Sequence, residues 1–151
     1  MNYIDTALEL ASEAAKQGEV PVGAVIVFNN QVIAKAHNKK ECLQNSLMHA
    51  ELIAIEQASN FLKTWRLNEC ELYVTLEPCP MCMAALQQAR IKKVYYGAED
   101  LKGGAISLGF NLNHDLRLNH RFDVEYVKNE KCGEILTDFF KLKRKKIDQK
   151  N

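Results

Sequence analysis

Hydrophobic positions along the chain follow two periods, one typical of helices and one typical of strands. Four segments have the three-to-four-residue apolar spacing or the start signals of helices. They are residues 1–17, 49 to about 61, 79 to about 89, and 131 to about 145. Gly18 follows the first segment and suits the left-handed backbone with which many helices end. The pattern therefore predicts four helices.

Five shorter apolar runs have the composition of strands, at residues 20–28, 32–34, 72–76, 94–97 and 122–127. Asn29 and Asn30 form a turn signal between the first two runs, which predicts an antiparallel hairpin. Gly23 inside the first run indicates either a close approach to the backbone or a simple packing glycine. The order of helices and strands predicts a mixed sheet between two layers of helices, a three-layer α/β/α sandwich.

Two stretches lack a clear period. Residues 38–48 are predicted to be a polar loop that leads into the second helix. Residues 101–119 are rich in glycine and asparagine and are predicted to be a long functional or mobile loop.

Composition favours a single domain over residues 1–151, because 151 residues with 47% apolar and 26% charged residues suffice for one buried core. We expect no membrane-spanning segment and no signal peptide. Five cysteines, an odd number, argue against a disulfide framework. The sequence thus predicts a cytoplasmic protein with reduced thiols.

The net charge is only +1, so no global basic field indicates a nucleic-acid partner. Basic residues are nevertheless clustered locally. One cluster lies in the last predicted helix (Lys141, Lys143, Arg144, Lys145, Lys146) and a smaller one at Arg90, Lys92 and Lys93. Such a cluster either binds the phosphate groups of a nucleic acid or forms a solvent-exposed helix face. Runs of charged residues more commonly form an exposed face.

Two short motifs carry the chemistry of the chain, His49-Ala50-Glu51 and Pro78-Cys79-Pro80-Met81-Cys82. One imidazole and two thiols are the ligand set of a catalytic zinc site, in which three protein ligands leave the fourth position open for water. The sequence therefore predicts a zinc ion held by His49, Cys79 and Cys82.

Local geometry explains the spacing within each motif. Pro80 suits the first position of a helix, which places Cys79 at a strand-to-helix corner and Cys82 one turn further on. His49 and Glu51 fall in the first turn of another helix, and residues two apart do not share a face. We therefore expect Glu51 to reach the water from the side as a general acid and base, and not to be a ligand.

Two other interpretations of the cysteine pair are weaker. A redox C-x-x-C pair usually accompanies a thioredoxin-like context, which is absent here. A structural zinc site needs a fourth cysteine or histidine at short spacing, and none follows Cys82 closely.

The H-x-E…P-C-x-x-C pairing is the signature of zinc nucleobase deaminases. Over almost its whole length the chain resembles the bacterial tRNA-specific adenosine deaminases, which belong to the cytidine deaminase-like superfamily. The stretches that carry the resemblance are residues 19–25, Asn38, 49–51, 72–79, 96–100, 119–121 and 138–140. The stretch that ends at Asp100 and the basic ending after Phe139 and Phe140 distinguish the tRNA branch.

The resemblance implies a five-stranded cytidine deaminase-like fold, a homodimer with one zinc ion per subunit, and conversion of adenosine to inosine at the wobble position of a tRNA anticodon stem-loop. No DNA or membrane partner is expected. Glu51 would be the proton shuttle. The same match implies that Asn38 binds the flipped base and that Asp100 contacts the anticodon backbone. It also implies substrate-contacting positions at Val22, Ala50, Phe140 and Arg144.

The chain departs from the family pattern beside the motifs, at Ser46-Leu47-Met48 and at Met83. Either methionine can reshape the pocket or simply repack the core. Two other functions remain as alternatives. One is a free nucleobase or nucleoside deaminase, for guanine or cytosine, that uses the same zinc site. The other is a catalytically silent RNA-binding protein, against which the intact Glu51 argues.

Overall fold

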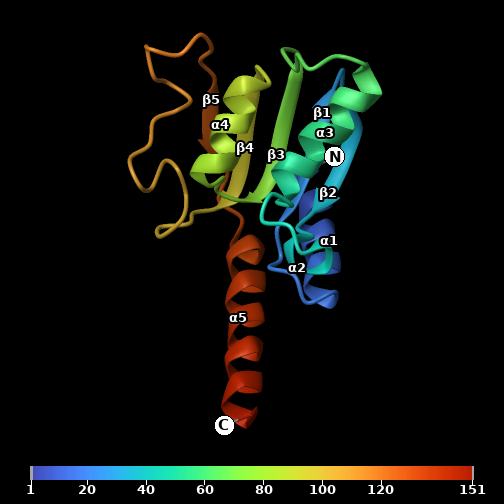
Figure 1. Ribbon diagram of the computed structural model, residues 1–151, viewed down its shortest axis with the longest axis vertical. Helices are drawn as coiled ribbons and strands as arrows, with labels where there is room; N and C mark the ends of the chain where they lie inside the picture. The colour runs from blue at the N-terminus through green and yellow to red at the C-terminus, as the bar shows by residue number, and fades with distance from the viewer. Residues whose placement is uncertain (1, 151) are drawn as a thin grey trace.

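The computed structural model describes residues 2–150 (Figure 1). Its elements follow one another in the order α1 (Tyr3–Lys16), β1 (Gly23–Phe28), β2 (Gln31–His37), α2 (Lys40–Leu43), α3 (Ala50–Leu62), β3 (Cys70–Leu76), α4 (Pro80–Gln88), β4 (Lys93–Ala98), β5 (Asp123–Tyr126) and α5 (Glu130–Lys150).

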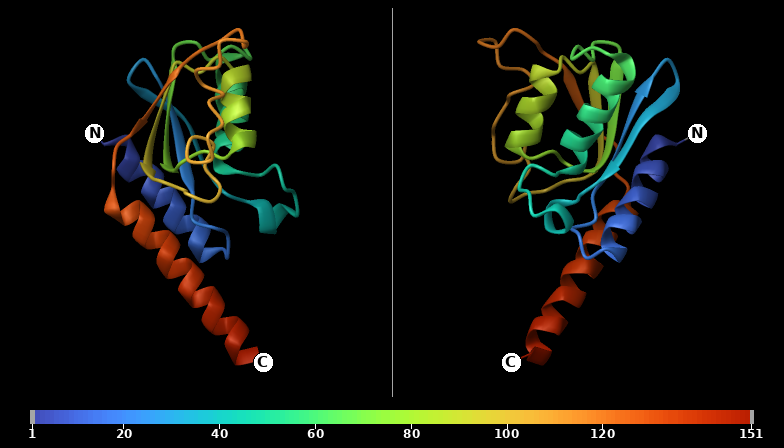
Figure 2. Two further views of the ribbon diagram at one scale, coloured as in Figure 1. Left: turned by 90° about the vertical axis from the view of Figure 1, so that its left-hand side faces the viewer. Right: turned by 45° about the vertical axis from the view of Figure 1, so that its right-hand side comes forward.

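The five strands form one mixed sheet in the order β2-β1-β3-β4-β5. Strand β1 is antiparallel to both β2 and β3, whereas β3, β4 and β5 run parallel. Helices α1 and α5 cover one face of the sheet, and α3 and α4 cover the other (Figure 2). The predicted three-layer α/β/α sandwich with a mixed five-stranded sheet is confirmed.

The core lies between the sheet and the α3–α4 layer. Leu72 and Val74 of β3 and Ile26 of β1 are fully buried there. On the opposite face, α1 packs so closely that a Cβ atom at Gly23 would overlap with the carbonyl oxygen of Ala7. The glycine in β1 is therefore required by the helix that crosses it, which resolves the two interpretations of Gly23 in favour of a close approach.

Several predicted boundaries differ from the structure. Strand β1 begins at Gly23 and not at residue 20, and β2 runs from Gln31 to His37, well beyond residues 32–34. The predicted loop at 38–48 contains the short helix α2. Polar residues do not interrupt β2 because it is an edge strand, which exposes part of its length to solvent.

Helix α5 begins against the sheet and then leaves it (Figure 1). Cys132 near its start is fully buried, whereas every side chain from Lys141 to Gln149 is exposed. The spacing of Ile135, Leu136, Phe139 and Leu142 predicts one buried apolar face for this helix. Ile135, Leu136 and Phe139 are half-buried, but Leu142 is 61% exposed because the helix has by then passed the edge of the domain. None of the helices in residues 2–150 is long and apolar enough to cross a membrane.

Candidate active site

The start of α3 and the start of α4 bring the two sequence motifs together on one face of the sheet. His49 is the N-cap residue of α3, Cys79 is the N-cap residue of α4, and Cys82 lies in the first turn of α4. Pro80 occupies the first turn of α4, as the sequence predicted. Because α4 follows β3 directly, the strand end fixes the position of Cys79.

The three candidate ligands form a compact group. Nδ1 of His49 lies 3.7 Å from Sγ of Cys79 and 3.4 Å from Sγ of Cys82. Ligands at about 2.0 and 2.3 Å from a common tetrahedral centre are separated by about 3.5 Å. The donor set and its spacing therefore fit a metal ion with three protein ligands, and all three ligand atoms lie within 4.8 Å of one another.

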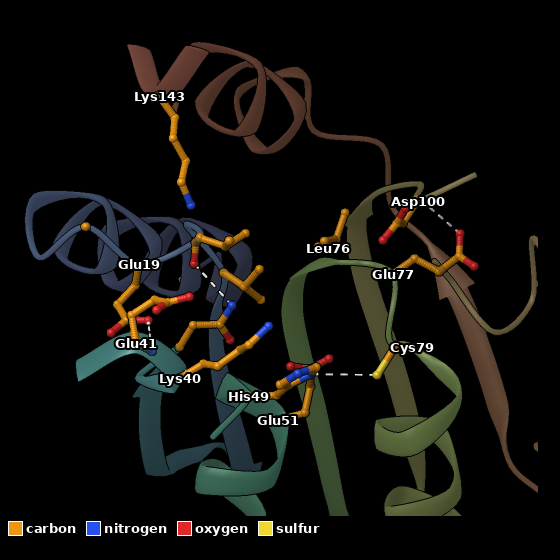
Figure 3. Close-up of a pocket in the computed structure, with 14 residues that line it drawn as sticks. Glu19, Lys40, Glu41, His49, Glu51, Leu76, Glu77, Cys79, Asp100 and Lys143 are labelled. Carbon is orange, nitrogen blue, oxygen red and sulfur yellow. Dashed lines mark hydrogen bonds between the residues drawn. The ribbon is translucent and has the colours of Figure 1, made fainter. Parts of the chain in front are cut away.

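Glu51 lies beside this group without belonging to it. Its side chain is only 4% exposed, yet it lines the pocket together with His49 and Cys79 (Figure 3). Burial raises the pKa of Glu51 to about 7. A carboxyl group with a pKa near neutrality is suited to accept a proton and return it.

The two thiols differ in their acidity. The hydrogen bond with Cys82, followed by the one with His49, lowers the pKa of Cys79 to about 4. The hydrogen bond with Cys79 and burial raise the pKa of Cys82 above its usual range. The hydrogen bond with Cys79 raises the pKa of His49. A metal ion binds thiolates and neutral imidazole, so its binding at this group releases protons.

A pocket of about 230 Å³ opens above these residues. Pockets for drug-sized ligands usually measure about 300–1,000 Å³, so this one suits a smaller group. Its lining comes from both helical layers and consists of Gly18, Glu19, Val20, Val22, Asn38, Lys40, Glu41, His49, Glu51, Leu76, Glu77, Cys79, Asp100 and Lys143.

Three of the six substrate-contacting residues expected from the resemblance, Val22, Asn38 and Asp100, line the pocket. Ala50, Phe140 and Arg144 are not part of the lining. On α5 the residue that reaches the pocket is Lys143. Sequence reasoning also missed Lys40, Glu19 and Glu77. The available signal was the position of Glu19 and Glu77, each of them charged and adjacent to an apolar run.

Asn38 connects two walls of the pocket. Its side-chain oxygen accepts a hydrogen bond of 2.8 Å from the backbone N–H of Ala50, and its side-chain nitrogen donates to the carbonyl oxygen of Val20 at 3.1 Å. An amide side chain has two donor and two acceptor positions. Asn38 therefore keeps one of each for a ligand.

Neither methionine beside the motifs lines the pocket. Met83 is fully buried in the core, and Met48 is half-buried, with its carbonyl oxygen accepting from the N–H of Lys39 at 3.0 Å. None of the departures from the family pattern therefore lies in the pocket lining.

The chain matches the family model of the MafB19-like deaminases over residues 1–144. It belongs to this deaminase family, as the His-Cys-Cys group and the neighbouring glutamate already indicated.

Curated relatives define the branch. The chain is 46% identical to the tRNA-specific adenosine deaminase of Bacillus subtilis, over 99% of this chain and 94% of the relative. It is also 46% identical to that of Aquifex aeolicus, over 96% of both. Within the family, this chain therefore belongs to the tRNA-specific adenosine deaminases.

Solved structures agree. A tRNA:A34 deaminase studied for A-to-I editing at the wobble position superimposes with a TM-score of 0.84 at 41% identity, over 89% of this chain and 98% of the other. The guanine deaminase of Bacillus subtilis superimposes with a TM-score of 0.64 at 38% identity, over 73% and 71%.

Proposed function

We propose that this protein converts adenosine to inosine at the wobble position of a tRNA anticodon, with one zinc ion per subunit. The observation that carries the proposal is the buried Glu51 beside the His49–Cys79–Cys82 group, at the floor of a pocket too small for a whole nucleotide strand. A base inside a duplex cannot reach the floor of such a pocket, whereas an unpaired loop base can rotate out of its stack and enter the pocket.

Zinc is the metal that this donor set favours, since two thiolates and an imidazole are typical of its catalytic sites. When bound, it supplies a Lewis acid that activates water for attack at neutral pH. Two thiolates and a neutral imidazole balance the charge of the ion. Cys79 and Cys82 both lie at the N-terminus of α4, where the helix dipole supports the thiolate form.

Glu51 moves the protons of the reaction. It accepts one proton from the water that attacks C6 of adenine and delivers it to the ring nitrogen N1. It then takes the second proton of that water and passes it to the departing amino group, which leaves as ammonia while inosine forms. Its pKa near 7 allows both directions of transfer.

Two cations support an RNA substrate over a free base. Lys40 and Lys143 line the pocket from opposite elements, α2 and α5 (Figure 3). A free base carries no phosphate, whereas a base within RNA has a phosphate on each side, and cations at the mouth follow such a backbone. The protein would act in the cytoplasm, where its tRNA substrate is found.

A homodimer is part of the same proposal. Large apolar side chains remain exposed around the α3–α4 layer and its loops (Leu43, Leu47, Phe61, Trp65, Leu101, Leu108, Phe110). Exposed apolar side chains that gather on one surface are typical of an interface. A second copy would cover it.

The similarity to a guanine deaminase makes free guanine the second candidate substrate. The purified, zinc-loaded protein is incubated in parallel with guanine and with an anticodon stem-loop that carries adenosine at the wobble position. The proposal predicts ammonia release from the RNA and none above background from guanine. Release from guanine alone would overturn it in favour of the second candidate.

A further inference from the structure

Two carboxylates beside the active site are buried and form no ion pair with any other residue in 2–150. Glu19 is 1% exposed and Glu77 is 2% exposed, and both line the pocket. None of the ion pairs among the described residues includes either side chain. A buried carboxylate is costly unless hydrogen bonds satisfy it, so its partners indicate its purpose.

Glu19 binds the start of α2. Its Oε1 accepts from the backbone N–H of Glu41 at 2.9 Å, and its Oε2 accepts from the backbone N–H of Cys42 at 2.6 Å. The first N–H groups of a helix have no partner within the helix, and a carboxylate satisfies two of them at once. Lys40, which lines the pocket, is the residue directly before them.

Glu77 binds the opposite wall in the same way. Its Oε1 accepts from the backbone N–H of Asp100 at 3.2 Å and from the hydroxyl of Ser107 at 2.7 Å. Its Oε2 accepts from the backbone N–H of Ser107 at 2.9 Å. A Cβ atom at Gly104 would overlap with this carboxylate, so the loop closes tightly around it.

Glu19 and Glu77 lie on opposite sides of the site. Figure 3 shows Glu19 with Glu41 on one side, Glu77 with Asp100 on the other, and His49, Glu51 and Cys79 between them. Each glutamate holds a segment with little regular structure. Glu19 holds the segment that contains the four-residue helix α2, and Glu77 holds the turns after β4. Without these carboxylates, backbone N–H groups in both walls would lose their acceptors.

We infer that Glu19 and Glu77 are positioning residues for the substrate. Each of them fixes one wall of the pocket by accepting hydrogen bonds from backbone N–H groups. Lys40 lies on the wall that Glu19 holds, and Asp100 lies on the wall that Glu77 holds. The inference rests on the proposed function and deepens it. Substrate binding, and not the chemical step, then depends on these two side chains. Only a carboxylate can accept at both oxygens, so glutamine in either position leaves one N–H group facing a donor.

The test compares Glu19→Gln and Glu77→Gln with two controls that remove the same charge from the surface. Glu9→Gln lies on α1 before Glu19, and Glu99→Gln lies directly beside Asp100; both glutamates are exposed. Zinc content, kcat and KM for the wobble-adenosine stem-loop are measured for all four. We expect KM to rise roughly tenfold in each test variant, since a hydrogen bond to a charged group is lost, with kcat within about twofold and zinc retained. A fall in kcat at unchanged KM, or loss of zinc, would overturn the inference.

Hydrogen exchange supplies a readout that needs no activity. The amides of Glu41 and Cys42 should exchange faster in Glu19→Gln, and those of Asp100 and Ser107 in Glu77→Gln, while β3 stays protected. Unchanged exchange at these amides would contradict the inference, whether or not the wild-type protein makes inosine. Failure of the wild-type protein to make inosine would refute only the proposed function.

Milder variants cover the case in which a glutamine variant does not fold. Ser107→Ala removes only the hydroxyl donor from an exposed residue, and Glu19→Asp keeps the charge but withdraws it by one methylene. Both should raise KM in the same direction by a smaller factor. A KM equal to that of the wild type in both would overturn the inference.

Discussion

Glu51 lies two residues from His49, and this spacing separates proton transfer from metal binding. We expect Glu51→Gln to retain zinc and to lose turnover by about 10²–10⁴-fold, the usual contribution of a general acid–base group. Metal analysis and the rate of inosine formation measure the two effects separately. Glu56→Gln, an exposed carboxylate on the same helix, serves as the control and should behave as wild type. Loss of zinc in Glu51→Gln would make Glu51 a ligand.

Asp100 has both a local and a functional interpretation. Its Oδ1 accepts a hydrogen bond of 3.0 Å from the N–H of Gly103, as in a common turn, and the residue also lines the pocket. Asp100→Asn keeps an acceptor for the turn. We expect it to reduce kcat/KM on RNA by tenfold or more while Tm changes by only a few degrees. An unchanged kcat/KM on the stem-loop would mean that Asp100 only stabilises the turn.

At the scale of elements, α5 is the part whose role depends most on charge. Its residues from Lys141 onward are exposed, and Lys143 reaches the pocket lining. Ending the chain after Phe140 removes these cations, so we expect a higher KM for RNA and a flatter dependence of KM on salt. A chain that ends after Lys146 retains the five clustered cations, Lys141, Lys143, Arg144, Lys145 and Lys146, and is the control. An identical salt slope in both would make the basic residues a solvated helix face.

The helices and strands also show which features of the structure can be predicted from the sequence. Amphipathic spacing and the two motifs predicted the three layers and the His49–Cys79–Cys82 group, because periodicity and ligand spacing are local properties. The short helix α2 was missed because a four-residue segment has no period, and Glu19, which holds it, lies more than twenty residues earlier. Lys143, which lines the pocket, was not predicted for a related reason. One residue of offset on a helix is about 100° of rotation, and only the packing of α5 fixes which residue points into the pocket.

At the scale of the whole molecule, stability should fall at alkaline pH. Tyr73 stacks on Tyr95 with ring centroids 4.5 Å apart, and burial, followed by the charge of Glu71, raises the pKa of Tyr73 to about 12. Between an unfolded-state pKa of about 10 and this value, the unfolded chain releases a proton that the folded protein keeps. The free energy of unfolding therefore decreases as pH rises across that window.

Tyr73→Phe removes this contribution, so its free energy of unfolding should decline less steeply than that of the wild type from pH 9 to 12. Denaturant titrations at matched pH values measure the difference. Tyr126→Phe is the control, since Tyr126 lies on the edge strand β5 and is 39% exposed. Parallel pH profiles for the wild type and Tyr73→Phe would contradict the assignment.

The fold, the metal group and the pocket together lead to one claim, deamination of a single unpaired adenosine within RNA. The most direct test incubates the zinc-loaded protein with two anticodon stem-loops, one with adenosine at the wobble position and one with that adenosine moved by one nucleotide. Inosine is then located by sequencing. We expect inosine at the wobble position of the first RNA, none in the second, and none in either with Glu51→Gln. Absence of inosine from the first RNA, with zinc bound, would contradict it.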